Sequence, residues 1–88
     1  MPQYAVNIIG LMNAGRELGH FPLWLLFRDM ITTETVDPVP NKVEHTAFLI
    51  RQDVTPERWE AVVKVVRSRL RKPQFPLYEK HGSNWRQV

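Results

Sequence analysis

The sequence of 88 residues predicts one small α+β domain, residues 1–88. We expect two N-terminal helices, a central strand, a long basic amphipathic helix, and a C-terminal β-hairpin that completes a small antiparallel sheet. Three observations lead to this prediction. Residues 55–72 have helical apolar periodicity with signals at both ends, residues 43–52 are rich in β-branched and aromatic residues, and residues 74–88 centre on a glycine turn.

The first segment, residues 4–18, has two interpretations. As a helix it places its apolar residues on one face, namely Ala5, Ile8, Ile9 and Met12. As a strand its first six residues alternate, and the following NAGRELG forms a loop. Gly10 and Gly15 weaken both interpretations, the helix by about 1 kcal/mol each relative to alanine. We expect the helix, and the strand stays open as the alternative.

The next segment, residues 20–33, is predicted to be a helix. Pro22 suits the first turn, and one face is apolar: Leu23, Leu26, Phe27, Met30 and Ile31. Trp24 and Leu25 widen the apolar surface beyond this face. The helix is therefore either buried on two sides, the commoner outcome in so small a protein, or it presents a hydrophobic patch to a partner. A homodimer that buries this patch is a variant of the second outcome.

Residues 34–42 contain two prolines and form a connection. The following residues 43–52 are the clearest strand. Phe48 and Ile50 lie on one face, and Ala47 and Leu49 lie on the other. Because both faces are apolar, we expect an interior position in the sheet.

The helix at residues 55–72 has the strongest signals. Thr55 is a good N-cap, Pro56 suits the first position, and Pro73 ends the helix. One continuous apolar stripe should cover the sheet: Trp59, Val62, Val63, Val66 and Leu70. Glu60 and Lys64 stand in the favourable order for an ion pair on the solvent side.

The C-terminal segment, residues 74–88, is predicted to be a hairpin. Gly82 and Ser83 would form a type II′ turn with glycine at the first central position. This turn sets the pairing as Lys80 with Trp85, Glu79 with Arg86, Tyr78 with Gln87, and Leu77 with Val88.

Several chemical classes find no support in the sequence. The absence of cysteine excludes disulfides, cysteine zinc sites and a cysteine nucleophile. His20, His45 and His81 lack metal-ligand spacing. Ser68 and Ser83 are the only serines, and neither a GxSxG elbow nor a glycine-rich phosphate loop occurs. We expect no catalytic residues, no metal, no cofactor and no enzymatic activity.

The ends and the hydropathy point to a small intracellular protein. The chain begins with Met1, as a complete gene product would, and its first arginine is Arg16, so a secretory signal is not expected. The longest apolar run, residues 21–27, is too short to span a bilayer. We expect a cytoplasmic protein without a membrane partner.

Charge is distributed unevenly along the chain. Residues 1–50 carry a net charge of −2 and residues 51–88 carry +5, which gives the overall +3. Such asymmetry favours an acidic partner for the C-terminal part. The candidate partner-binding residues are Arg58, Lys64, Arg67, Arg69, Arg71, Lys72, Lys80 and Arg86.

Two functions follow from this charge. The first is a protein-interaction module, such as an inhibitor or adaptor that blocks an acidic or nucleic-acid-binding surface of a larger protein or nucleoprotein, as small phage proteins often do. Arginine and tryptophan are common anchors of such interfaces. The alternative is a regulator that binds DNA or RNA through helix 55–72 and the hairpin, with Phe75, Tyr78 or Trp85 stacking on unpaired bases. We favour protein interaction because no nucleic-acid motif is complete.

Overall fold

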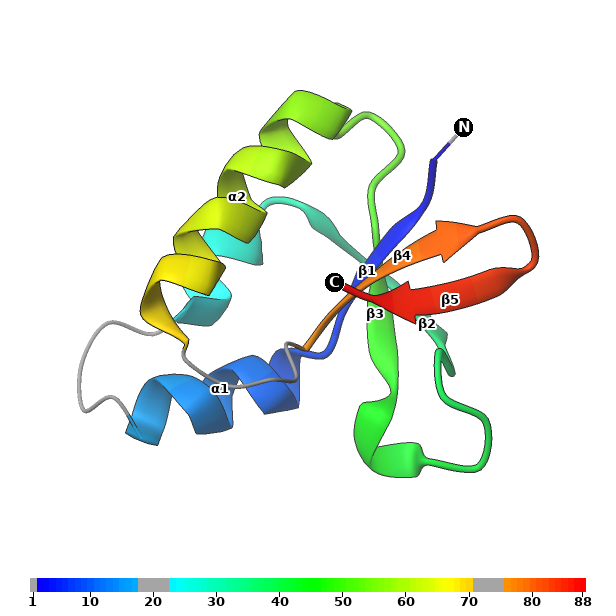
Figure 1. Ribbon diagram of the computed structural model, residues 1–88, viewed down its shortest axis with the longest axis horizontal. Coiled ribbons are helices and arrows are strands. Elements are labelled where there is room, and N and C mark those ends of the chain that lie inside the picture. Colours follow the sequence, from blue (N-terminus) through cyan, green and yellow to red (C-terminus); the bar gives the residue numbers. More distant parts are fainter. Residues whose placement is uncertain (1, 18–22, 71–75) are drawn as a thin grey trace.

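The computed structural model describes residues 2–17, 23–70 and 76–88, with the backbone alone for residues 14–17. The elements in chain order are β1 (Tyr4–Val6), α1 (Ile8–Glu17), the 3-10 helix η1 (Leu23–Phe27), β2 (Ile31–Val36), the 3-10 turn η2 (Val43–His45), β3 (Ala47–Ile50), α2 (Pro56–Arg69), β4 (Leu77–His81) and β5 (Asn84–Gln87). The helices lie beside one sheet (Figure 1). Within the described ranges, no helix combines the length and the apolar character that crossing a bilayer requires.

The five strands form one antiparallel sheet in the order β2-β3-β1-β4-β5. Up to β4 the connectivity is β-α-β-β-α-β, with β1 and β3 as the inner strands. This is the split β-α-β, or ferredoxin-like, arrangement, and β5 extends it by one strand. The predicted α+β class is confirmed. The sheet is larger than predicted because two segments expected to be helical contain strands.

The N-terminal segment contains both of the structures considered for it. β1 comes first, and α1 begins only at Ile8. The predicted apolar face of this helix is wrong, since Leu11 is buried while Ile9 and Met12 are exposed. The reason is that Ala5 belongs to the sheet, so it does not set the phase of the helix.

Asn7 joins β1 to α1 and holds two distant segments in place. Its Oδ1 accepts a hydrogen bond from the Gly10 N–H at 3.0 Å, as an N-cap does. Its Nδ2 donates to the Glu44 carbonyl at 2.9 Å, and its backbone N–H donates to the Pro76 carbonyl at 2.8 Å. This polar side chain is buried and fully engaged, so it specifies where α1 starts.

The helix predicted for residues 20–33 is wrong. Of its described part, only η1 is helical, and β2 starts at Ile31. The Met30 N–H donates to the Phe27 carbonyl, and the Met30 carbonyl accepts from the Arg51 N–H, so the chain turns into the sheet here. β2 has the sequence ITTETV, in which five of six residues are β-branched. Such residues favour strands when a partner strand is available.

β2 bulges away from β3 at its centre. Ile31 pairs with Ile50 and Thr35 with Phe48, so three residues of β2 face one residue of β3. The Thr32 hydroxyl donates to the Leu49 carbonyl at 2.9 Å and accepts from the Glu34 N–H at 3.2 Å. This hydroxyl therefore replaces ladder contacts that the bulge interrupts.

β3 is shorter than predicted, because residues 43–45 form η2 before the strand begins. Its interior position is confirmed, since β2 and β1 flank it. The predicted alternation also holds. Ile50 belongs to the core under the helices, while Ala47 and Leu49 pack on the opposite face.

Two apolar clusters lie on the two faces of the sheet. The larger one joins the sheet to α1, η1 and α2 through buried residues that include Val6, Leu11, Phe27, Ile50, Trp59, Val63, Val66 and Leu77. The smaller one contains Ala5, Ala47 and Tyr78, with Val36, Val39, Leu49 and Trp85 packed against it. Both faces of the central strand β1 are therefore buried.

The predictions for α2 and the hairpin are confirmed where the structure describes them. Thr55 caps α2 by accepting the Arg58 N–H at 3.1 Å, and Pro56 is its first residue. The helix ends at Arg69, earlier than predicted. In the hairpin, the strands pair as Tyr78 with Gln87, Glu79 with Arg86 and Lys80 with Trp85, and Val88 N–H donates to the Leu77 carbonyl. Gly82 has a φ of 64° while Ser83 has no positive φ, as a type II′ turn requires.

Candidate functional site

The outer side of α2 is basic, and its inner side is packed into the core. Its inner side is buried through Trp59, Val63 and Val66, with Leu70 just beyond its end. The residues on its outer side are exposed, and the basic ones are Arg58, Lys64, Arg67 and Arg69. Because the inner side is fully packed, the outer side is fixed relative to the sheet.

Three of these cations lack an ion-pair partner among the described residues, although Arg58 adds to the lowering of the Asp53 pKa that the hydrogen bond from Arg51 begins. Among residues 2–17, 23–70 and 76–88, no side-chain hydrogen bond or ion pair is formed by Arg58, Lys64 or Arg67. Among the same described residues, the expected ion pair between Glu60 and Lys64 is not formed. Their charges are thus available to a partner. Arg69 makes a contact of its own and is not counted with them.

The two basic residues of the hairpin do not join this surface as one patch. Lys80 lies on the sheet face opposite α2, with its Nζ 5.9 Å from the centre of the Trp85 ring. Arg86 faces the helix side, opposite Glu79. The predicted binding set is therefore divided between two faces of the sheet. Arg71 and Lys72 lie outside the described residues.

Glu79 faces Arg86 in the predicted register, and its carboxylate also bonds to α2. Its Oε2 accepts a hydrogen bond from Trp59 Nε1 at 2.8 Å, and its Oε1 lies 3.6 Å from His81 Nε2. This bond ties β4 to the first turn of α2 on its inner side. The sequence gives a partial signal, since a buried tryptophan usually needs an acceptor for its N–H.

An aromatic stack with acidic neighbours lies near the N-terminal end of α2. The rings of Tyr4 and Trp59 are stacked at 4.6 Å between centroids, with 14° between their planes. Burial raises the pKa of Tyr4, and the carboxylates of Glu79, Glu57 and Glu60 raise it further. Three carboxylates thus act on Tyr4 at the start of α2, beside Arg58, whereas Lys64, Arg67 and Arg69 lie on its later turns.

The aromatic side chains expected to stack on nucleic-acid bases are not displayed for that purpose. Tyr78 is buried, and its hydroxyl lies 3.0 Å from His45 Nδ1. Burial raises the pKa of this hydroxyl. Trp85 is half-buried under Lys80. Phe75 lies outside the described residues.

The hydrophobic patch predicted at residues 24 and 25 is modest. Leu25 is 39% exposed and Trp24 is half-buried, both on η1. Ile9 at 69% and Met12 at 43% are more exposed, on α1. The sequence places both residues on the apolar face of the predicted helix, and it therefore did not predict their exposure.

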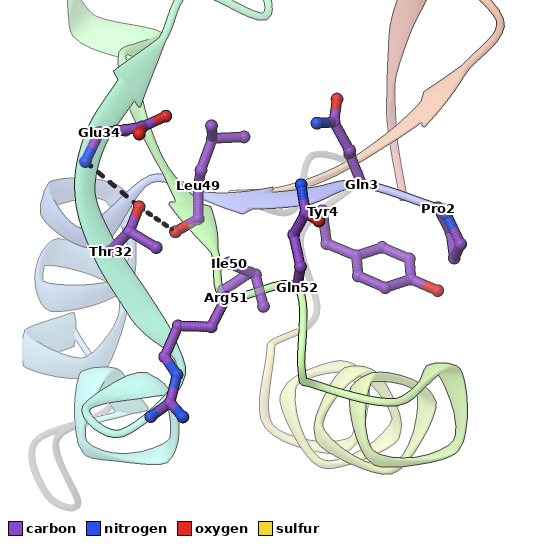
Figure 2. A pocket seen from close by; sticks show the side chains of 9 residues that line it. All are labelled: Pro2, Gln3, Tyr4, Thr32, Glu34, Leu49, Ile50, Arg51 and Gln52. Atoms are coloured by element: carbon purple, nitrogen blue, oxygen red, sulfur yellow. Dashed lines mark hydrogen bonds between the residues drawn. The ribbon is translucent and has the colours of Figure 1, made fainter.

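A shallow hollow of about 110 Å³ lies at one end of the sheet (Figure 2). It opens between Gln3 at the start of the chain and Glu34 on β2. The Arg51 guanidinium beside it is already bound to Asp53, whose pKa it lowers. Figure 2 shows the side chains of Gln3, Glu34 and Arg51 pointing in different directions, so they do not converge on one ligand. In the described part of the chain, no group of three potential metal ligands occurs.

The comparisons with known proteins add no assignment to this surface. The chain matches no protein-family model, and no curated protein and no solved structure is significantly similar to it.

Proposed function

We propose that the chain is a small, non-enzymatic binding protein that acts through protein–protein contact in the cytoplasm. It would serve as an inhibitor or adaptor that covers an acidic or nucleic-acid-binding surface of a larger protein or nucleoprotein. One observation carries this proposal. Arg58, Lys64 and Arg67 are exposed, form no ion pair with any described residue, and lie on a helix whose other side is packed into the core.

The physical argument concerns the cost of binding. Association costs free energy for every group that must be ordered, and a helix already fixed by its buried side has little backbone entropy left to lose. Within residues 2–17, 23–70 and 76–88, these three cations have no ion pairs that binding would have to break. An acidic partner would gain their full electrostatic attraction, and added salt would weaken that attraction.

The alternative, a nucleic-acid-binding regulator, uses the same cations and the charge of +5 in residues 51–88. It has less support from the arrangement of the remaining groups. Lys80 points away from α2, and the expected stacking residue Tyr78 is buried. Glu57 and Glu60 are exposed on α2 and would repel a phosphate backbone.

Affinity capture from an extract of the source cells tests the proposal, performed with and without nuclease. The bait is the whole chain, compared with Arg67→Glu and with the control Lys42→Glu, which makes the same charge change beside η2, away from α2 (Figure 1). We expect a stoichiometric protein that survives nuclease, is lost with Arg67→Glu and is kept with Lys42→Glu. Retention of nucleic acid alone, or equal loss with both variants, would contradict the proposal.

Both variants should fold normally. Their side chains are exposed and form no hydrogen bond or ion pair with described residues, and such substitutions usually change stability by less than about 0.5 kcal/mol. Circular dichroism and thermal unfolding provide the check. A large loss of stability for Arg67→Glu would show that this arginine is structural.

A further inference from the structure

We infer that the partner receives α2 as a ridge in a groove with acidic walls, so that cations on both flanks of the helix are contacted together. This inference rests on the proposed function and specifies the shape and the chemistry of the partner surface. It is argued from the placement of the unpaired cations around the helix, from the residues between them, and from the acidic end of α2.

Arg58 and Arg67 lie on opposite flanks of α2. Successive residues of an α-helix are about 100° and 1.5 Å apart, so these two residues are about 180° apart around the axis and about 14 Å apart along it. Both are exposed, and both are unpaired among the described residues. Lys64 lies between the crest of the helix and the Arg67 flank. A partner that contacts only one side of α2 would leave one of these arginines unused.

The crest of α2, the line farthest from the core, carries small uncharged side chains beyond its first turn, where the exposed Glu57 lies about 30° from it. By the same spacing, Ala61 and Ser68 lie opposite the buried side, and both are exposed. The Ser68 hydroxyl already donates to the Val65 carbonyl at 2.7 Å, so it offers no free donor. A ridge with a low crest and long cationic side chains on both flanks matches a concave acidic surface better than a flat one.

The distribution of acidic residues favours a protein groove over the major groove of DNA. The DNA major groove also admits a helix, but both of its walls carry phosphates along their whole length. Glu57 and Glu60 are exposed at the N-terminal end of the same helix. With Glu79 they form an acidic region around Tyr4, whose pKa is raised first by burial and then by these three carboxylates. A protein groove can place neutral or basic groups opposite this region, whereas a phosphate wall cannot.

The test measures dissociation constants by calorimetry at low salt. The probe is the protein that the wild-type chain retains from nuclease-treated extract, identified by mass spectrometry and prepared pure. The variants are Arg58→Glu and Arg67→Glu for the two flanks, Ala61→Lys for the crest and Lys42→Glu as control, each checked by circular dichroism. We expect each flank variant to weaken binding at least tenfold, Ala61→Lys to weaken it as well, and Lys42→Glu to leave it unchanged.

The outcomes separate the inference from the proposed function. If only one flank variant weakens binding, or if Ala61→Lys tightens it, the contact is flat, and the inference fails while the proposed function stands. If no protein is retained stoichiometrically, both fail. A parallel titration with a DNA duplex provides the third outcome: tight binding that both flank variants abolish and that falls steeply with salt would assign the ridge to nucleic acid and overturn the inference.

Discussion

Replacing Gly10 with alanine should destabilise the protein, although the same change stabilises most helices. Gly10 lies in the first turn of α1, where the helix passes close to Pro76. A Cβ atom added at Gly10 would lie 2.9 Å from the Pro76 Cβ, 3.2 Å from Asn7 Nδ2 and 3.3 Å from Asn7 Cγ. The proline ring is rigid and begins the segment leading into β4. The clash therefore displaces either α1 or the Asn7 side chain.

The magnitude follows from two opposing terms. Helix propensity favours alanine over glycine by about 1 kcal/mol. Overpacking at a rigid contact costs about 1–3 kcal/mol, and weakening either hydrogen bond of the Asn7 amide costs about 1 kcal/mol more. We expect a net destabilisation of about 1–3 kcal/mol, opposite in sign to the propensity.

The assay is denaturant unfolding monitored by circular dichroism, with thermal unfolding as a second measurement. Asn13→Ala is the matched control, because Asn13 is exposed on the same helix. Propensity alone should stabilise that variant by about 0.5 kcal/mol. If Gly10→Ala matches or exceeds the wild type in unfolding free energy, the close approach of α1 to Pro76 is not a constraint, and the reasoning is refuted.

Three further predictions concern single interactions. Trp59→Phe should lower the unfolding free energy by about 2–4 kcal/mol, because it removes packing and the N–H bond to Glu79; Glu79→Gln, which keeps an acceptor oxygen, should cost less in the same denaturation assay, and equal costs would contradict the assignment. Thr32→Val should cost about 1–2 kcal/mol by leaving the Leu49 carbonyl and the Glu34 N–H without their hydroxyl partner, whereas Thr32→Ser should keep most of the stability; a neutral Thr32→Val would show that the bulge holds itself. Both tyrosines have a pKa above the ordinary 10.0, so the folded state holds the phenol proton more tightly than the unfolded chain. Their contribution to stability is complete below pH 10 and is lost as the pH rises through the folded pKa values, and an ultraviolet titration that shows tyrosinate in the folded protein below pH 10 would contradict this.

The parts of the fold that the sequence predicted are those encoded locally. Thr55, Pro56 and the apolar stripe of α2 lie within one helix, so they need no knowledge of the rest of the chain. The hairpin register follows from Gly82 alone, because a two-residue turn fixes every pair after it. The exposure of the α2 cations also followed from the same helical period.

The parts that were missed depend on partner strands. β1 has three residues, too few for a pattern, and it exists because β3 and β4 flank it. The apolar residues 23–27 suggested a helix that was extended to residue 33. The β-branched residues that start at Ile31 are a strand signal, and they form β2. Asn7 before an apolar segment is an N-cap signal that would have placed the start of α1 correctly. The separation of Lys80 from the α2 surface could not be predicted without knowing which face of the hairpin α2 covers.

β2 is an edge strand of the sheet, and the bulge that interrupts its pairing with β3 also affects whether a strand of another polypeptide can pair with its outer edge. A foreign strand that docks there needs evenly spaced amide and carbonyl groups over several consecutive residues. The bulge between Ile31 and Thr35, which contains the exposed Glu34, breaks that spacing at mid-strand. Fibril growth or sheet fusion across the β2 edge is thereby disfavoured by the geometry of the strand.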